Sequence, residues 1–393
     1  MSVHELALQR NKYKHLSDDE WRWFLQQVEG RERTADKLPT FASIPDWWYP
    51  VRLSCEQCSS ELTARYKASL VSGEKMADLT AGYGVDTYFL SERFTSADYV
   101  EQNAELCRIA EHNFKQPTPS LSKGKEICVH NTTAEEFLHQ ITNQKSQITN
   151  QKSGYDLIFA DPARRDSHGG KVFRLEDCTP NIVELLPTLL EHLTPDGRIM
   201  LKLSPMLDLT QALKALTPYT LHRTPLQWDI HIVAVKNEVK EVLLLSGGNS
   251  TITAIDLDKK DQAFVFTKEE EKNAPSSFHL SSFTFLYEPS ASILKAGAYK
   301  LVAQRFNLHK LDVNTHLYAS EILVENFPGR VFKALPFKEG MGLGSQANVI
   351  CRNYPLSAEQ LKKKLHLRDG GTAFVIGCRV AGKPTLFYAE RIL

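Results

Sequence analysis

Three features are scarce in this 393-residue chain, and each limits what the protein can be. Net charge is absent, because 47 basic residues balance 47 acidic ones, so a polyanion would need a local basic patch. No run approaches about 18 apolar residues, so we expect no membrane-spanning helix. The first twenty residues are charged and lack the apolar stretch of a secretion signal, so we expect a cytoplasmic protein.

Cysteine is also sparse, with seven residues in the chain. Cys55 and Cys58 form a single CxxC pair. A structural zinc site normally has four ligands, usually from two such pairs, and no second pair is present. The spacing therefore favours buried, reduced thiols over a metal site.

The chain is too long for one hydrophobic core, which indicates two or three domains. Residues 1–70 are predicted to be mainly helical, with a linker that contains Trp47 and Trp48. The two indole rings could stack on a base, but packing against the next domain is the favoured interpretation. Residues 140–146 and 147–153 repeat the sequence QITNQKS, which indicates an expanded surface loop.

From Met76 onward, β-like and helix-like runs alternate, which predicts a doubly wound α/β fold with a parallel sheet. The predicted strands are 76–79, 97–101, 126–130, 155–160 and 197–203, and the helices between them are 86–94, 103–114, 133–141 and 181–193. The runs 230–235 and 241–246 are predicted to form an antiparallel hairpin at the sheet edge. A boundary is expected near residue 247, and a small α+β module is expected at the end of the chain.

The stretch DLTAGYGVD, residues 78–86, follows the first predicted strand and precedes a helix. Gly82 and Gly84 allow a tight turn and a close approach to a ligand. A dinucleotide-binding turn would have a third glycine, but Thr87 occupies that position. Asp78 at the strand end can accept a hydrogen bond from an ammonium group, and Asp86 suits the start of the next helix. This arrangement favours a cationic amino-acid ligand over a pyrophosphate.

Polar residues also end the other predicted strands. Glu101 follows the second strand and can accept both ribose hydroxyls of an adenosine. The ends of parallel strands meet at one crevice, which is where such sheets bind ligands. S-adenosylmethionine is therefore a better candidate ligand than NAD. The candidate cofactor-binding residues are Asp78, Thr80, Gly82, Gly84, Asp86, Glu101, Thr132, Ala134 and Asp161.

Residues 60–246 resemble the class I S-adenosylmethionine-dependent methyltransferases, through DLTAGYGVD and Glu101. The runs ADPARRD, LKLSPM and ANVICRNYPLSAEQLKKKLHLRDGG are similar to those of a bacterial group with ferredoxin-like and THUMP-like domains. The resemblance implies a seven-stranded Rossmann-like core and methylation of RNA. It implies four regions: a helical region at 1–70, a methyltransferase domain at 71–246, a ferredoxin-like α+β domain at 247–325 and a THUMP-like domain at 326–393.

The fourth predicted strand ends in Asp161-Pro162-Ala163-Arg164. Amino-group methylases have Asp/Asn-Pro-Pro-aromatic at the matching corner, where the acid and a backbone carbonyl hold the amine of a flipped base. Asp161, Pro162 and Arg164 are thus candidate catalytic residues, although Asp161 could simply cap the next turn. No cysteine lies at this corner, so methylation of an amine or a ring nitrogen is the simpler chemistry.

Basic residues outnumber acidic ones by six between Pro328 and Arg368. Lys362, Lys363 and Lys364 lie on a predicted helix there and are candidate RNA ligands, together with Arg165 and Lys202. A solubilising face, or salt bridges, is the alternative interpretation of these side chains.

We therefore expect an S-adenosylmethionine-dependent methyltransferase that acts on a base nitrogen of tRNA or rRNA and captures RNA with its C-terminal domain. Two alternatives stay open. One is a methyltransferase of a small molecule or protein. The other is a non-catalytic RNA-binding protein that retains the fold.

Overall fold

The computed structural model describes residues 3–117, 126–145, 154–163, 174–221, 224–258, 263–276, 282–338 and 345–393. The chain divides into two compact units, residues 1–229 with 243–249, and residues 230–242 with 250–393. The four expected domain ranges stay a prediction. No helix in the described ranges is long and apolar enough to cross a membrane.

Helices form most of the N-terminal region, as predicted. They are α1 (Val3–Ala7), the 3-10 turn η1 (Arg10–Tyr13), α2 (Asp18–Thr34), α3 (Pro39–Ser43), α4 (Arg52–Gln57) and α5 (Glu61–Ser69). A capping box begins α2, in which the Ser17 side chain accepts from the Glu20 N–H and the Glu20 side chain accepts from the Ser17 N–H.

The two tryptophans of the linker pack against the rest of the first unit, which confirms the favoured interpretation. Trp47 is 4% exposed, stacks on Phe41 at a centroid distance of 4.1 Å and donates its indole N–H to the Tyr83 hydroxyl at 2.9 Å. Trp48 stacks on His112 at 3.6 Å. Both rings therefore join the N-terminal helices to the α/β core.

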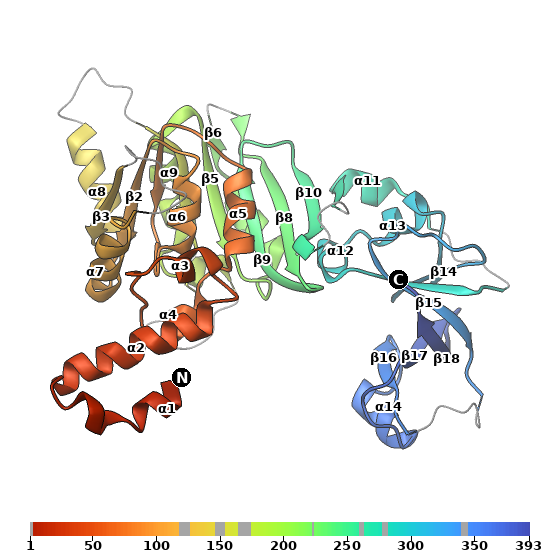
Figure 1. The fold of residues 1–393 in the computed structure, drawn as a ribbon. Helices are drawn as coiled ribbons and strands as arrows, with labels where there is room; N and C mark the ends of the chain where they lie inside the picture. Colours follow the sequence, from red (N-terminus) through yellow and green to blue (C-terminus); the bar gives the residue numbers. More distant parts are fainter. Residues whose placement is uncertain are drawn as a thin grey trace. The chain divides into compact units, whose positions relative to one another are not determined.

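Five parallel strands form the centre of the first unit, in the order β3-β2-β1-β4-β5 (Figure 1). Their bounds are β1 (Lys75–Asp78), β2 (Ser96–Glu101), β3 (Glu126–Asn131), β4 (Tyr155–Ala160) and β5 (Leu193–Leu203). The helices between them are α6 (Val85–Ser91), α7 (Ala104–Asn113), α8 (Ala134–Lys145) and α9 (Ile182–Glu191), with the short η2 (Leu175–Asp177). Helix α10 (Leu209–Leu216) follows β5. Helix α5 packs beside α6, and α9 packs beside α8 and α10. The predicted doubly wound α/β core is confirmed.

The loop predicted from the QITNQKS repeat is only partly described. Residues 140–145 of the first copy belong to helix α8, and the rest of the repeat lies outside the described residues.

Strands β8 (Trp228–Val235) and β9 (Glu238–Ser246) form the predicted hairpin. Its two turn residues, Lys236 and Asn237, have φ angles of 53° and 60°, as the tight turn of a two-residue hairpin requires. Strand β9 lies next to β5, so the hairpin completes the seven strands of the expected core.

The expected position of this hairpin at the sheet edge is wrong. Strand β10 (Thr251–Asp256) lies parallel to β8, and β11 (Phe264–Thr267) pairs antiparallel with β10. The sequence predicts β-like character for this polar stretch, but it gives no sign that the stretch pairs with the hairpin. In β10 the alternate side chains Ile252 and Ala254 are buried.

A second sheet lies in the second unit, in the order β13-β14-β12-β15-β18-β17-β16. Its strands are β12 (Phe285–Pro289), β13 (His309–Asp312), β14 (Thr315–Ser320), β15 (Gly329–Pro336), β16 (Asn348–Arg352), β17 (Ala373–Val380) and β18 (Lys383–Arg391). The helices are α11 (Lys268–Asn273), α12 (Ala291–Ala296), α13 (Tyr299–Arg305) and α14 (Ala358–Lys364). The predicted α+β module, with strands on both sides of α14 in the sequence, is confirmed.

Replacing Trp47 with alanine should destabilise the first unit by about 3 to 5 kcal/mol, because a buried, stacked indole is lost and a cavity remains. Urea unfolding followed by circular dichroism measures this change. Leu53→Ala is the control, since Leu53 is 55% exposed and its loss should cost under about 0.5 kcal/mol. Equal effects of the two substitutions would contradict the packing role of Trp47.

Candidate functional site

A cavity of about 440 Å³ lies in the first unit, at the carboxyl ends of β1, β2 and β4. The structure brings all but one of the predicted cofactor residues to its wall: Asp78, Thr80, Gly82, Asp86, Glu101, Thr132, Ala134 and Asp161. Gly84 is not among the lining residues. The convergence expected from parallel strands is therefore present.

The two glycines of the loop after β1 serve different purposes. Gly82 has a φ angle of 56°, which favours glycine, and its N–H donates to the Glu101 carboxylate at 2.9 Å. Gly84, with a φ angle of 83°, begins helix α6, and an added Cβ would lie 3.0 Å from Phe114 and 3.2 Å from Tyr99. Gly84 therefore permits close packing beneath the loop.

Asp78 is a fully buried carboxyl group at the end of β1. It accepts hydrogen bonds from the Thr80 N–H at 3.1 Å and the Thr87 hydroxyl at 2.6 Å. No basic side chain in the described ranges forms an ion pair with it. Burial raises the pKa of Asp78 to about 7, and the nearby carboxylates of Asp86 and Asp161 act in the same direction.

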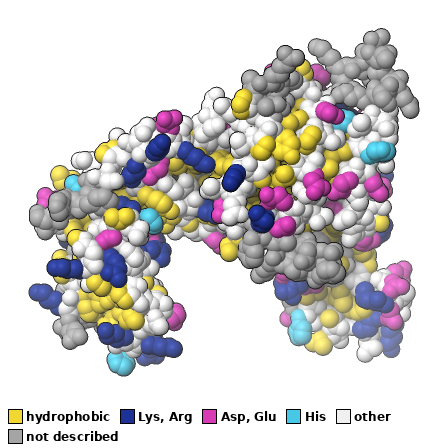
Figure 2. Space-filling view, turned by 180° about the vertical axis from the view of Figure 1, so that it is seen from behind, with side chains coloured by type: hydrophobic (Ala, Val, Ile, Leu, Met, Phe, Trp, Pro, Cys, Tyr) yellow, Lys and Arg dark blue, Asp and Glu magenta, His cyan; other side chains and the backbone are white. Residues whose placement is uncertain are grey.

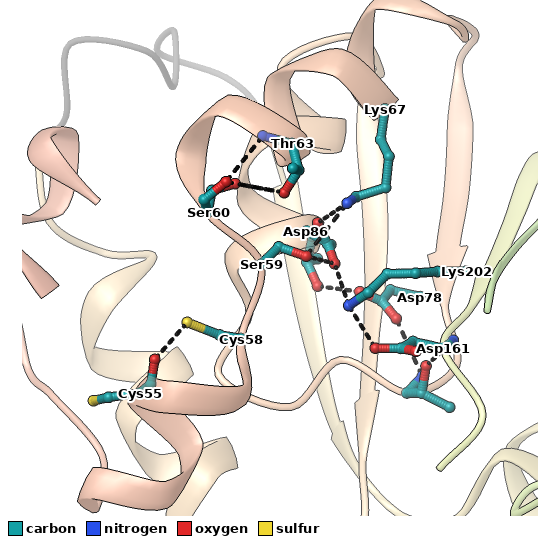
Figure 3. A network of polar contacts seen from close by, with 12 residues as sticks. Cys55, Cys58, Ser59, Ser60, Thr63, Lys67, Asp78, Asp86, Asp161 and Lys202 are labelled. Atoms are coloured by element: carbon teal, nitrogen blue, oxygen red, sulfur yellow. Dashed lines mark hydrogen bonds and ion pairs between the residues drawn. The ribbon is translucent and has the colours of Figure 1, made fainter. Parts of the chain in front are cut away.

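Asp86 is also buried, but two ammonium groups accompany it (Figure 3). Its carboxylate lies 3.2 Å from Lys67 Nζ and 3.5 Å from Lys202 Nζ, and Ser59 Oγ donates to it at 2.7 Å. Burial favours a higher pKa for Asp86, but the two lysines outweigh it and lower the pKa. Asp86 lines the cavity, but its carboxylate is already engaged by the side chains of two lysines and a serine.

Asp161 lies where β4 ends, and it is held through its backbone N–H and through its carboxylate. The Asp161 N–H donates to Thr80 Oγ1 at 2.6 Å, and Lys202 Nζ donates to Asp161 Oδ2 at 2.6 Å. The side chain of Asp161 is 39% exposed, whereas that of Lys202 is 14% exposed. Lys202 thus lies in the cavity wall between two carboxylates. Of the two interpretations of this side chain, a phosphate ligand or a salt bridge, the structure favours the salt bridge.

Of the residues that directly follow Asp161 in the sequence, the structure describes only the first two. Pro162 is buried, and Ala163 exchanges two backbone hydrogen bonds with Thr179. Arg164 and Arg165, predicted to act in catalysis and RNA binding, lie outside the described residues.

The residues expected near an adenosine also line the cavity. Glu101 accepts from the N–H groups of Gly82 and Asn103, at 2.9 and 2.8 Å. Thr132 and Ala134 lie at the end of β3 and the start of α8, and both line the cavity. The Thr132 hydroxyl donates to Glu136 at 2.8 Å.

Sequence reasoning missed the contribution of the N-terminal region. Ser54, Gln57 and Cys58, from α4 and its end, line the cavity, and so does Ser59. Lys67 on α5 was missed because a lysine on a short helix is usually exposed, whereas this one is fully buried. Its one sequence signal is its spacing from Thr63 and Ala64, which lie on the same buried helix face.

The basic patch of the C-terminal module is smaller than the sequence suggested. Lys362 pairs with Glu359 at 2.6 Å and with Asp369 at 2.8 Å. Arg330 and Arg352 both pair with the buried Glu288 of β12. Lys363 and Lys364 are exposed. These two lysines are therefore the better candidates for a polyanion site.

Comparison with solved structures identifies the family. A protein from Porphyromonas gingivalis W83, named as a putative methyltransferase, is 32% identical over 96% of this chain and 91% of its own, with a TM-score of 0.81. The chain belongs to this methyltransferase family. Family models for a ferredoxin-like domain and a THUMP-like domain match residues 285–328 and 327–391. The predicted resemblance is confirmed.

Other matches are weaker. An rRNA methylase from Streptococcus thermophilus is 12% identical over 47% of this chain and 93% of its own, with a TM-score of 0.31. A methyltransferase from Agrobacterium tumefaciens, named as SAM-dependent, is 19% identical over 37% of this chain and 43% of its own, with a TM-score of 0.27. Similarity at this level identifies neither a ligand nor a substrate. No curated protein matches the chain.

Asp78→Asn should stabilise the protein at pH 8, by up to about 4 kcal/mol at 1.36 kcal/mol per pKa unit. The raised pKa means that the folded protein holds a proton that the unfolded chain releases above about pH 4. The wild type therefore loses stability as the pH rises toward 7, and asparagine does not. Urea unfolding between pH 5 and 8 should show a gain that shrinks at low pH.

Asp98→Asn is the matched control, because the expected change in stability has the opposite sign there. Burial favours a higher pKa for Asp98, but His130 and Lys75 outweigh it and lower the pKa. The Asp98 carboxylate therefore adds stability at neutral pH, and its loss should destabilise the protein at pH 8. A stabilising Asp98→Asn, or a destabilising Asp78→Asn, would contradict these electrostatic assignments.

Proposed function

We propose that the chain is an S-adenosylmethionine-dependent methyltransferase that methylates a base nitrogen of structured RNA, either tRNA or rRNA. One observation carries the cofactor assignment: a buried carboxyl group, Asp78, lines the cavity with no ion-pair partner among the described residues, and Glu101 lines the same cavity. An ammonium group at one end of the ligand and ribose hydroxyls further along match this pair of acids.

The residues of the cavity fit the parts of S-adenosylmethionine. Asp78 and the backbone of the loop from Thr80 to Gly82 accommodate the amino-acid end, and Glu101 accepts hydrogen bonds from the ribose. Thr132 and Ala134 border the adenine. A cavity of about 440 Å³ lies within the usual range of about 300–1,000 Å³ for small-ligand sites. When bound, the cofactor supplies an electrophilic methyl group.

The acceptor end lies at Asp161, the most exposed of the cavity's three aspartates. Its carboxylate can accept an N–H of the base and hold the nitrogen toward the methyl group, as in amino-group methylases. Pro162 restricts the backbone of this corner. We assign Arg164 the role of contacting the base. Positioning supplies most of the rate in such a transfer.

The C-terminal module supports RNA as the substrate. Its residues 327–391 match a THUMP-like domain, and Lys363 and Lys364 are exposed on α14. Figure 2 shows Lys and Arg side chains around a hydrophobic patch on one face of this C-terminal part. We assign Lys202 no separate phosphate contact, since it pairs with Asp86 and Asp161, and we keep Arg165 as a candidate RNA ligand.

A small-molecule or protein acceptor is the second candidate. The pairing of Arg330, Arg352 and Lys362 with carboxylates favours it, because these side chains are then less available to phosphates. Transfer of a labelled methyl group from S-adenosylmethionine to total RNA, but not to the protein or small-molecule fraction of the same cells, supports RNA. Label in another fraction supports the second candidate, and binding of RNA without transfer indicates a non-catalytic protein.

Glu101→Ala should weaken S-adenosylmethionine binding about 10- to 100-fold, because hydrogen bonds to a charged group contribute about 1.5–3 kcal/mol. Calorimetric titration measures the Kd. Glu105→Ala is the control, since Glu105 lies in the first turn of α7 and pairs with Arg108 at the surface. NAD should not bind either protein. Unchanged affinity in Glu101→Ala would remove the ribose assignment.

Reversing the charge of Lys363 and Lys364 to glutamate should weaken RNA binding about tenfold and lower the salt slope by about two. Filter binding at several salt concentrations measures both quantities. A Lys12→Glu/Lys14→Glu protein is the control, because these exposed lysines lie in the N-terminal region. Equal loss in both double variants would indicate a general charge effect without a site on α14.

A further inference from the structure

We propose that Lys202 is a positioning residue for Asp161, and that a buried chain of alternating charges fixes Lys202 in turn. This inference rests on the proposed methyl transfer. The chain runs from Lys67 on α5 through Asp86 on α6 and Lys202 on β5 to Asp161 at the end of β4 (Figure 3). Its members come from four separate elements, so it is a product of the fold.

Exposure rises steadily along this chain. The side chain of Lys67 is 0% exposed, that of Asp86 10%, that of Lys202 14% and that of Asp161 39%. Only the last member is therefore readily accessible to a substrate. The four charges sum to zero, which makes their burial tolerable, since a buried charge needs a partner.

Among the described residues, the geometry at Asp161 leaves one carboxylate oxygen for a substrate. Lys202 holds Oδ2 at 2.6 Å, and Thr80 fixes the backbone by accepting from the Asp161 N–H. Oδ1 has no hydrogen bond to a residue of the described ranges. A carboxylate held in this way can present Oδ1 to an acceptor N–H with little loss of rotamer entropy on binding.

Asp86 keeps Lys202 from moving fully toward the substrate. Its Oδ2 lies 3.5 Å from Lys202 Nζ and accepts from Ser59 Oγ at 2.7 Å, while Lys67 lies 3.2 Å from Oδ1. Lys202 is thus shared between two acids. Gln57 and Cys58, from α4 and its end, line the same cavity as Asp161.

Kinetics of Lys202 variants test the proposal, with labelled S-adenosylmethionine and the RNA that accepts methyl groups from the wild type. Lys202→Met should lower kcat about 100-fold, the usual effect of misplacing a reacting group, and change the Kd for S-adenosylmethionine less than about twofold. Lys202→Arg should restore most of kcat, because guanidinium also pairs with a carboxylate. Lys67→Met should lower kcat in the same direction.

Lys75→Met is the matched control. Lys75 pairs with Asp98 at 3.2 Å, but it begins β1 at the opposite end of the strand from Asp78. This variant loses an ion pair of similar length and should keep kcat within about twofold of the wild type.

A measurement without turnover tests the pairing itself. In a ¹⁵N-lysine spectrum of the cofactor-free protein, a signal from a protected ammonium group should be absent in Lys202→Met and shifted in Asp161→Asn. An Asp161→Asn spectrum with that signal unchanged overturns the proposal.

The outcomes separate this inference from the proposed function. Wild-type binding and transfer with undiminished kcat in Lys202→Met overturn the role of Lys202 alone. The role of Lys202 is also overturned if Lys202→Met and Lys202→Arg lose kcat equally at intact cofactor affinity. The positive charge that arginine retains would then not matter. Absence of cofactor binding or of transfer by the wild type overturns both the proposed function and this inference.

Discussion

A carboxyl group that is buried with no counter-ion among the described residues is the feature on which the cavity depends. Asp78 and Asp86 are eight residues apart and both buried, yet only Asp86 has ammonium partners within the described residues. The difference appears in their pKa values, which burial raises for Asp78 and two lysines lower for Asp86. A cationic ligand would compensate the charge of the Asp78 carboxylate. The charge of Asp86 is already compensated by the two lysines.

The parallel sheet explains why such groups meet. Its register places Met76 beside Ala97 and Leu157, so β1, β2 and β4 end at one level. Their last residues or first loop residues are Asp78, Glu101 and Asp161, and these acids therefore face one cavity. The loop after β1 contacts both of the other acids. The Thr80 hydroxyl accepts a hydrogen bond from the Asp161 N–H, and the Gly82 N–H donates one to the Glu101 carboxylate.

Local patterns predicted the strands, the hairpin and the convergence of Asp78, Glu101 and Asp161, because these follow from periodicity and from the rules of parallel sheets. The charge chain could not be predicted. Lys67 has the sequence of an exposed helical lysine, and its burial depends on the distant Asp86 and Ser59. The position of β10 beyond the hairpin likewise depends on tertiary pairing, since its polar residues alternate with only a few buried apolar ones.

Proton release on ligand binding tests the central claim most directly. Calorimetric titration of S-adenosylmethionine at pH 7, in phosphate and in Tris, separates the binding heat from the buffer's ionisation heat. With the Asp78 pKa at about 7, the account predicts binding with net release of protons, as the carboxyl ionises against the ligand's ammonium group. It also predicts that Asp78→Asn abolishes the release. Absence of binding, or equal heats in the two buffers, would contradict the account.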